Sequence, residues 1–197
     1  MKKIIILLVG IVSTFIISCK KDSDSPSATA INGTWTFISM TANTSSTVEA
    51  TEGSETDKTI TKSNYTTEDN SGTITFDAST MTTDKVSYSV NTIAKGYTYL
   101  NNVFVDSMEA PFNFVMPPSS STITYKMVGT DSIYFDQGSV FMSGATQSTA
   151  PGGGKIKMEG DILYLTQSGR QTIVQNVPGM TIKTDEGGTV VIKLKKQ

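Results

Sequence analysis

The sequence predicts an all-β domain built from antiparallel strands. Apolar and polar residues alternate with a period of two through most of the chain after residue 31, as in strands with one buried and one wet face. The 197 residues include 30 threonines and 23 serines, and threonine favours extended backbone because it is branched at Cβ. No stretch shows helical periodicity over three turns. About ten strands are expected, so a closed barrel or a β-sandwich would protect the sheet edges.

Each expected strand is centred on large residues two positions apart. In the first part of the domain these residues are Trp35 and Phe37; Ile74 and Phe76; Val86, Tyr88 and Val90; Tyr97 and Tyr99; and Phe112, Phe114 and Met116. In the second part they are Ile123, Tyr125 and Met127; Ile133 and Phe135; Ile156 and Met158; Ile162 and Tyr164; and Val190, Ile192 and Leu194. In every case the large residues are expected to face the interior.

Turn residues separate these strands, and two polar stretches interrupt their rhythm. Turns are expected at Asn70-Ser71-Gly72, Asn101-Asn102, Gly129-Thr130-Asp131, Glu159-Gly160-Asp161 and Glu186-Gly187-Gly188. The stretches 41–57 and 144–154 are rich in small polar residues, and both are expected to be long mobile loops at one end of the barrel or sandwich.

The first 18 residues predict a signal peptide of the lipoprotein type. Met1, Lys2 and Lys3 form a charged n-region, and the following apolar run of 14 residues, 4–17, is too short for a comfortable transmembrane helix. Ile16-Ile17-Ser18-Cys19 resembles the bacterial lipobox, which implies cleavage between Ser18 and Cys19 and attachment of fatty acid, such as palmitate, to Cys19. Cys19 is the single cysteine of the chain. The alternatives are an ordinary secretory signal with an incidental cysteine and an uncleaved anchor.

Residues 19–30 predict a lipidated flexible tether, and residues 31–197 a single domain. The segment after Cys19 is charged, contains Pro26 and lacks large apolar residues up to position 27, so it cannot form a core of its own. Cys19-Lys20-Lys21-Asp22 resembles the lipoprotein export signal of Bacteroidetes, which implies an outer-membrane lipoprotein exposed at the cell surface. A charged solvated linker is the alternative. The expected partner of this segment is the membrane, reached through the lipid.

Three segments of the domain resemble the lipocalins and the lipocalin-like lipoproteins of Bacteroidetes. They are Gly33-Thr34-Trp35, similar to the lipocalin Gly-x-Trp motif, the late strand 160–166 and the closing strand 190–196. The resemblance implies an eight-stranded up-and-down barrel with Trp35 closing its bottom, and a basic residue over the tryptophan, for which Lys193 and Lys195 are candidates. Without the resemblance, a β-sandwich remains the alternative.

A barrel of about eight strands has room for side chains and one small apolar ligand. The residues expected to line either a pocket or a solid core are Tyr88, Tyr97, Tyr99, Phe112, Phe114 and Met127. A solid core explains alternating aromatic residues without any function.

Composition excludes most catalytic chemistry. The chain has no histidine and one cysteine, so it lacks the residues for a Ser-His-Asp triad, a Cys-His pair, an internal disulfide or the usual zinc ligand sets. No catalytic residue, metal or cofactor is predicted. The carboxylate pairs Asp131 with Asp136 and Glu159 with Asp161 are the nearest acid–base candidates, but each lies beside a turn glycine, where solvated acids are common.

Net charge argues against nucleic acid as a partner. Without Lys2 and Lys3 the chain carries 14 basic and 18 acidic residues, a charge of −4, whereas nucleic-acid binding needs a concentrated basic patch. Asp106-Ser107-Met108 and Asp131-Ser132-Ile133 resemble the O-glycosylation signal of Bacteroidetes, which makes Ser107 and Ser132 candidate glycosylation sites.

The sequence therefore favours a non-enzymatic, lipid-anchored lipoprotein of the cell envelope that binds a small apolar or amphipathic ligand. A structural or accessory surface lipoprotein, with a filled core and loops that contact protein or glycan, is the alternative. A hydrolase that uses carboxylates ranks far below both.

Overall fold

The computed structural model describes residues 31–136 and 151–197, and all regular structure in these ranges is β-strand. The strands are β1 (Gly33–Glu52), β2 (Glu55–Thr66), β3 (Glu68–Phe76), β4 (Thr80–Leu100), β5 (Val103–Val128), β6 (Ser132–Phe135), β7 (Gly152–Glu159), β8 (Ile162–Val177) and β9 (Met180–Lys196). The described part of the chain contains no helix with the length and apolar character needed to cross a membrane.

The nine strands form one antiparallel sheet that closes on itself as an up-and-down barrel. Strands that are adjacent in sequence pair with each other, except β2 and β3, and β9 returns to pair with β1 from Trp35↔Lys196 to Glu52↔Met180. Strands β2 and β3 share one place in the ring, because both lie between β1 and β4. Strand β3 pairs with the first residues of β1 and of β4, and β2 pairs with the later residues of both strands. The predicted all-β barrel is therefore confirmed.

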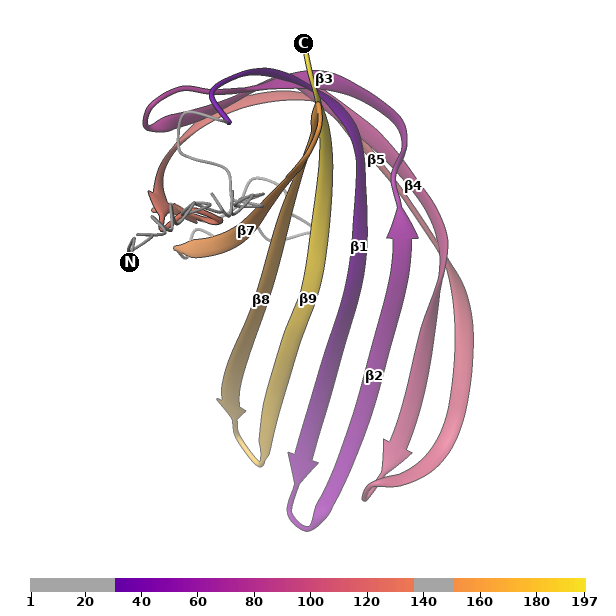
Figure 1. The fold of residues 1–197 in the computed structure, drawn as a ribbon. Coiled ribbons are helices and arrows are strands. Elements are labelled where there is room, and N and C mark those ends of the chain that lie inside the picture. The colour runs from indigo at the N-terminus through magenta and orange to yellow at the C-terminus, as the bar shows by residue number, and fades with distance from the viewer. Residues whose placement is uncertain (1–30, 137–150) are drawn as a thin grey trace, which may run out of the picture.

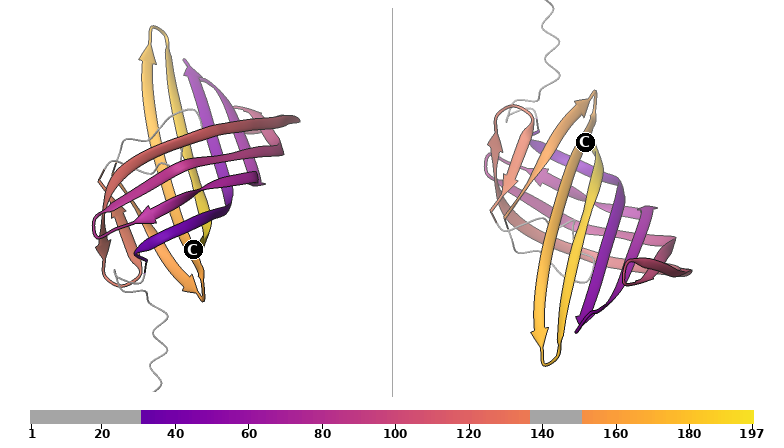
Figure 2. Two further views of the ribbon diagram at one scale, coloured as in Figure 1. Left: turned by 90° about the horizontal axis from the view of Figure 1, so that it is seen from above. Right: turned by 90° about the horizontal axis from the view of Figure 1, so that it is seen from below.

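The barrel has a closed end and an open half (Figures 1 and 2). At the closed end the short strands β6 and β7, of four and eight residues, bridge β5 and β8 and complete the ring. Beyond them six strands continue side by side in the order β8-β9-β1-β2-β4-β5, and we call this curved sheet the open half. Its inner face continues the interior of the barrel, and its outer face is the convex side.

The hydrophobic core fills the closed end. Trp35, Phe37, Phe76 and Phe135 are each 2% exposed or less, and they pack with the aliphatic residues of β8 and β9. Tyr125 joins them: its ring lies edge-on to Phe76, with 5.7 Å between ring centroids. Each fully buried side chain of this size stabilises the fold by about 1.5–3 kcal/mol through removal of apolar surface from water.

A β-bulge in β1 lets the strand keep its apolar residues inside. The register with β9 shifts between Phe37 and Ser39, so the inward series passes from Phe37 to Met40 with Ile38 left partly exposed. Opposite this region Thr67 separates β2 from β3. Its backbone N donates to the Met40 carbonyl at 2.9 Å, and its Oγ1 accepts from the Met40 N at 2.8 Å. One buried threonine thus satisfies the backbone groups that the strand break leaves unpaired.

Several sequence-based expectations of loops and turns are wrong. The stretch 41–57 is no loop, because β1 runs to Glu52 and β2 begins at Glu55. Asn70-Ser71-Gly72 lies inside β3, and Glu186-Gly187-Gly188 lies inside β9. The turns at Asn101-Asn102, Gly129 and Gly160 are confirmed, all with positive φ. Of the second expected loop, residues 144–150 lie outside the described residues, and Gly152-Gly153-Gly154 belongs to β7.

Gly72 gives a stability prediction that follows from a close backbone approach. It has φ +97°, and a Cβ there would lie 2.6 Å from the Lys85 carbonyl oxygen and from the Val86 backbone. We expect Gly72→Ala to lower the free energy of unfolding by about 2–3 kcal/mol, measured by urea denaturation. Gly53→Ala is the control, because Gly53 has φ +59° but open space around its Cβ position, and it should cost about 1 kcal/mol. Equal losses would refute a steric role for Gly72.

Candidate functional site

Five large side chains on the inner face lie where the closed end meets the open half, and we call them the inner aromatic shelf: Tyr65, Tyr88, Phe112, Phe114 and Met116. Register places them together, because Tyr88 pairs with Met116, the next inward position Val90 with Phe114, and Thr92 with Phe112. Tyr65 of β2 reaches the same place, with its ring centroid 6.0 Å from that of Phe112.

The shelf is joined to the buried core by a series of ring contacts. Ring centroids are 6.1 Å apart between Phe37 and Tyr88 and 6.2 Å apart between Tyr88 and Phe114. Exposure rises along this series from 1% at Phe37 through 6% at Tyr88 to 39% at Phe114, and Phe112 is 40% exposed. The shelf therefore presents exposed apolar surface, and contacts with the buried core hold its rings in place.

Small and hydroxyl residues lie next to the shelf on the inner face. Thr44 of β1 and Ser63 of β2 share a hydrogen bond of 2.7 Å, and Ala94 of β4 pairs with Ala110 of β5. Partial burial raises the pKa of Tyr65 above its ordinary value, and the pKa of Tyr88 is raised by burial first and by Tyr65 second. Both phenols are therefore neutral at physiological pH and can donate or accept hydrogen bonds. The arrangement suits a molecule with an apolar part and a hydroxyl-rich or otherwise polar part.

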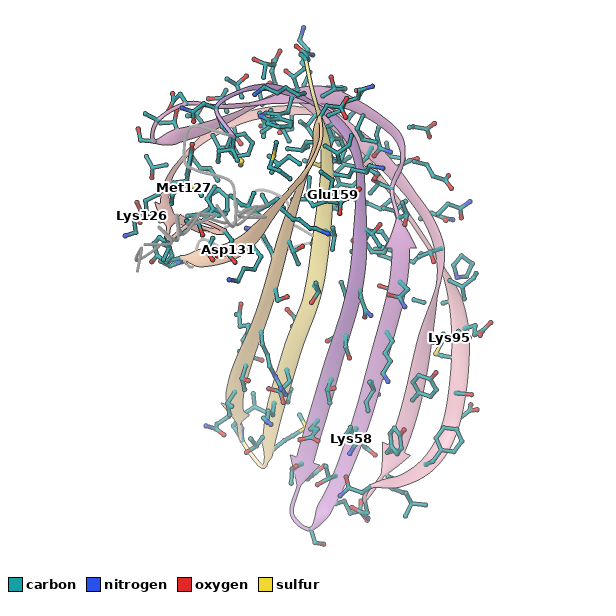
Figure 3. The ribbon with its side chains drawn as sticks, in the orientation of Figure 1. Lys58, Lys95, Lys126, Met127, Asp131 and Glu159 are labelled. Atoms are coloured by element: carbon teal, nitrogen blue, oxygen red, sulfur yellow. The ribbon has the colours of Figure 1, made fainter. Side chains whose placement is uncertain are left out.

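The predicted lining residues divide into four groups. Tyr88 is buried, Met127 is partly buried against the core near β6 (Figure 3), and Phe112 and Phe114 are half-exposed on the shelf. The prediction is wrong for Tyr97 and Tyr99, which lie on the outer face. There the Lys62 Nζ lies 5.8 Å from the Tyr97 ring and the Lys58 Nζ 5.2 Å from the Tyr99 ring.

The reason is the alternation of β4. Because Tyr88 and Val90 point inward, the even positions continue inward and odd positions such as 97 and 99 point outward. The same alternation error affects Ile162 and Tyr164, since the buried residues of β8 are Leu163 and Leu165. Tyr65 and Met116 belong to the shelf but were not predicted as lining residues. Met116 is part of the alternating series of β5, whereas Tyr65 is surrounded by polar residues and belongs to no alternating series.

Trp35 lies in the core at the closed end of the barrel. It is fully buried, and its indole Nε1 donates to the Ile31 carbonyl at 2.8 Å. The basic residue over its ring is Lys196, its partner across β1 and β9, with Nζ 5.3 Å from the ring. A Cβ at Gly33 would lie 3.8 Å from the Lys196 Cε, so the glycine leaves room for the lysine.

Lys193 and Lys195, the two candidates from the sequence, have other contacts. The Lys193 Nζ lies 6.0 Å from the Tyr164 ring, and the Lys195 Nζ lies 3.8 Å from the Asp161 carboxylate. Both predictions for the cation over Trp35 are therefore wrong, since the register of β9 gives that place to Lys196.

The candidate modification residues are placed as follows. Ser18 and Cys19 lie outside the described residues. Ser107 is exposed on β5, and its backbone N donates to the Asp106 carboxylate at 2.7 Å. Ser132 is half-buried at the start of β6, and its Oγ donates to Asp131 at 2.9 Å. Glycosylation at Ser107 and Ser132 stays a prediction.

The carboxylates considered for acid–base catalysis are all held in surface ion pairs, with Asp131 and Glu159 seen in Figure 3. The pairs are Asp131 with Lys155, Asp136 with Lys126, Glu159 with Lys157 and Asp161 with Lys195. The pKa of Asp131 lies below its ordinary value, mainly because Lys155 and then Ser132 donate to it, and Lys157 lowers the pKa of Glu159 in the same way. A general acid needs the opposite shift. The described residues also contain no group of three or more His, Cys, Asp or Glu that could hold a metal ion.

Comparisons with known proteins do not assign the chain to a family. No protein-family model matches it, and a search of curated proteins found no match. Among solved structures, the crystal structure of Ail, the attachment invasion locus protein of Yersinia pestis, aligns over 82% of this chain and 99% of that one, with 8% identity and a TM-score of 0.17. A likeness at that score carries no argument, so function is argued from the geometry.

Proposed function

We propose that this protein is a non-enzymatic, lipid-anchored lipoprotein of the cell envelope whose lipocalin-like domain binds a small amphipathic ligand at the inner aromatic shelf. The carrying observation is the half-exposure of Phe112 and Phe114, although both belong to a ring series anchored in the core. Large apolar side chains that stay exposed on a rigid, concave-facing surface are typical of ligand sites. The hydroxyl side chains next to them would receive the polar part of the ligand.

The envelope location in this proposal rests on the first residues of the sequence. The n-region, the short apolar run and the lipobox-like segment ending at Cys19 support lipidation. Within the fold, Gly33, Trp35 and Lys196 have the arrangement that the lipocalin resemblance implies, which supports the lipocalin-like part of the proposal. The Cys-Lys-Lys-Asp run supports exposure of the domain at the outer surface of the outer membrane.

The ligand can be tested by native mass spectrometry of the full chain, purified from its host in a nonionic detergent. We expect a co-purifying lipid-sized mass on the wild type. Phe112→Ser combined with Phe114→Ser should reduce the occupied fraction about tenfold or more, because burying one such ring stabilises a contact by about 1.5–3 kcal/mol.

The matched control is Tyr97→Ser combined with Tyr99→Ser, which removes two rings from the outer face of the same sheet. The control should leave the bound mass in place. Repeated observation of bare wild-type protein, or equal loss in both double variants, would reject the shelf as the site.

A structural or accessory lipoprotein is the second candidate. The observation that favours it is the dense packing of the closed end. There the large side chains of Trp35, Phe76 and Phe135 are buried and fill the core. Under this alternative the shelf is only the upper boundary of the core, and the same experiment would give bare protein.

A further inference from the structure

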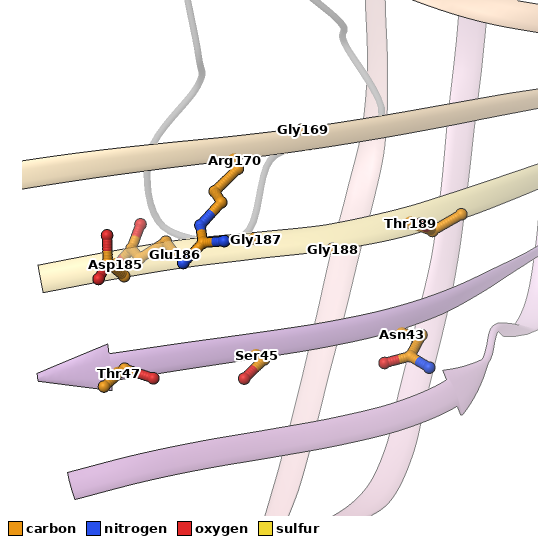
Figure 4. Close-up of a pocket in the computed structure, with 10 residues that line it drawn as sticks. All are labelled: Asn43, Ser45, Thr47, Gly169, Arg170, Asp185, Glu186, Gly187, Gly188 and Thr189. Carbon is orange, nitrogen blue, oxygen red and sulfur yellow. The ribbon is translucent and has the colours of Figure 1, made fainter.

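The outer face of the open half has a polar depression of about 480 Å³ over Gly187 (Figure 4). Gly187 of β9 forms its floor, Arg170 of β8 stands on one side, and Ser45 and Thr47 of β1 stand on the other. Asn43 and Thr189 extend the polar wall, and the acids Asp185 and Glu186 also line the depression. The floor exists because a glycine lies in the middle of a strand, where any other residue would place a side chain.

One continuous row of paired residues crosses this depression from strand to strand. Register gives the order Arg170, Gly187, Ser45, Lys62 and Lys95, from β8 through β9, β1 and β2 to β4. Neighbouring strands lie about 4.8 Å apart, so Arg170 and Lys62 are separated by three steps, about 14 Å. Between these two cations the row contains only a glycine and a serine.

Of the two acids that line the depression, Asp185 is engaged by other groups. The Lys183 Nζ lies 2.8 Å from the Asp185 carboxylate, and Thr172 also donates to Asp185. These contacts, with Lys183 first, and the charge of the neighbouring Arg170 hold the pKa of Asp185 below its ordinary value. Glu186 alternates to the inner face. At the far end of the row, Lys95 pairs with Glu109 at 2.9 Å.

Arg170 is the only arginine of the chain, and no ion pair joins its guanidinium to a carboxylate of the described residues. A planar guanidinium binds a carboxylate or sulfate through two parallel hydrogen bonds, which lysine cannot reproduce. Serine, threonine and asparagine side chains around it supply donors and acceptors for hydroxyl groups. Anionic groups and hydroxyl groups occur together in acidic sugars.

We propose that this depression binds an acidic oligosaccharide that lies across the strands over Gly187, with one acidic group at Arg170 and another directed to Lys62. The row of paired residues sets the direction of the bound chain, and the hydroxyl wall of β1 and β9 contacts its sugar hydroxyls. The site lies on the face of the sheet opposite the inner aromatic shelf. It therefore does not depend on the apolar ligand proposed above, and loss of either site would leave the other in place.

The test uses the full chain in phosphatidylcholine nanodiscs and measures dissociation constants by calorimetry. The probes are a heparin-derived hexasaccharide for sulfate, a hexasaccharide of polygalacturonic acid for carboxylate, and maltohexaose as the neutral control. We expect one or both acidic probes to bind at least tenfold more tightly than maltohexaose. The affinity should fall as salt is raised, because Arg170 and Lys62 are accessible to ions.

Variants connect binding to the depression. Arg170→Gln should weaken the acidic probe about tenfold or more, since charge-assisted hydrogen bonds are lost. Gly187→Thr should do the same by filling the floor, where a Cβ lies 3.3 Å from the Gly169 carbonyl oxygen and 3.6 Å from the Arg170 Cγ. Lys195→Gln is the matched control, because it removes an exposed cation of β9 at the other end of the strand and should change affinity less than twofold.

Each contrary outcome overturns the proposal. Absence of binding by both acidic probes, equal binding of maltohexaose, or unchanged affinity in Arg170→Gln would do so. Failure of Gly187→Thr to fold would leave Arg170→Gln to decide. Binding of phosphatidylglycerol vesicles that Arg170→Gln abolishes, without binding of either acidic oligosaccharide, would identify the depression as a membrane-contact surface instead.

Discussion

Trp35→Ala is expected to lower the free energy of unfolding by about 3–5 kcal/mol. The indole is fully buried at the closed end, so its removal leaves a cavity among residues that cannot collapse into it without distorting a closed ring of strands. The substitution also removes the hydrogen bond from Nε1 to the Ile31 carbonyl. That carbonyl would be left without its buried donor, which adds to the loss. Urea denaturation followed by far-ultraviolet circular dichroism measures the effect.

Two milder variants divide the effect of Trp35 into parts. Trp35→Phe keeps an aromatic ring but removes the donor, and it should cost about 1–3 kcal/mol. Lys196→Met keeps an aliphatic cover over the ring and removes the cation, and it should cost about 1 kcal/mol or less. A loss below about 1 kcal/mol in Trp35→Ala itself would show that the tryptophan does not close the core, contrary to its burial.

The sequence predicts the closed end well because only one face of each strand there is buried. Trp35 with Phe37, Ile74 with Phe76, and Val190 with Ile192 alternate with polar residues, and these large residues are all buried in the core. Along β1, β2 and β9 in the open half, by contrast, both faces carry mostly threonine, serine and charged residues. The alternation signal disappears there, although the backbone pairs over the whole length of β1 and β9. Composition, through the β-branched threonines, was the remaining indication of strand.

The sequence did not predict several features of the two sites, and these misses have one physical cause. The register between two strands depends on both strands, so the pattern of one strand alone does not give it. Tyr97 and Tyr99 alternate with polar residues as expected, but β4 runs unbroken from Tyr88 and pairs there with β2, so both rings point to the outer face. Lys196 lies over Trp35 because β9 pairs with β1 in one register. Gly187 and Gly188 suggested a turn, whereas Gly188 lies inside the sheet where a Cβ would be 2.7 Å from the Asn43 carbonyl oxygen. The two glycines therefore have separate roles inside the strand. Gly188 allows the close approach of the β1 backbone, and Gly187 forms the floor of the depression.

Cys19→Ser is expected to abolish incorporation of labelled palmitate and to move the protein from the membrane fraction to the soluble fraction. One acyl chain gives only marginal membrane binding, and stable attachment needs additional chains or a second signal. We therefore expect membrane attachment to depend on the proposed lipid on Cys19. Fractionation with parallel metabolic labelling measures both effects, and urea denaturation should show an unchanged fold.

A paired variant separates the lipid from the charges that follow it. Lys20→Gln combined with Lys21→Gln leaves Cys19 in place, so palmitate labelling should persist even if delivery to the cell surface changes. If Cys19→Ser kept both the label and the membrane attachment, the lipobox interpretation would be wrong. If the wild type carried no label and both forms stayed with the membrane, the apolar run 4–17 would be acting as an uncleaved anchor. The two readouts together thus distinguish the lipoprotein from both alternatives that the leader sequence allows.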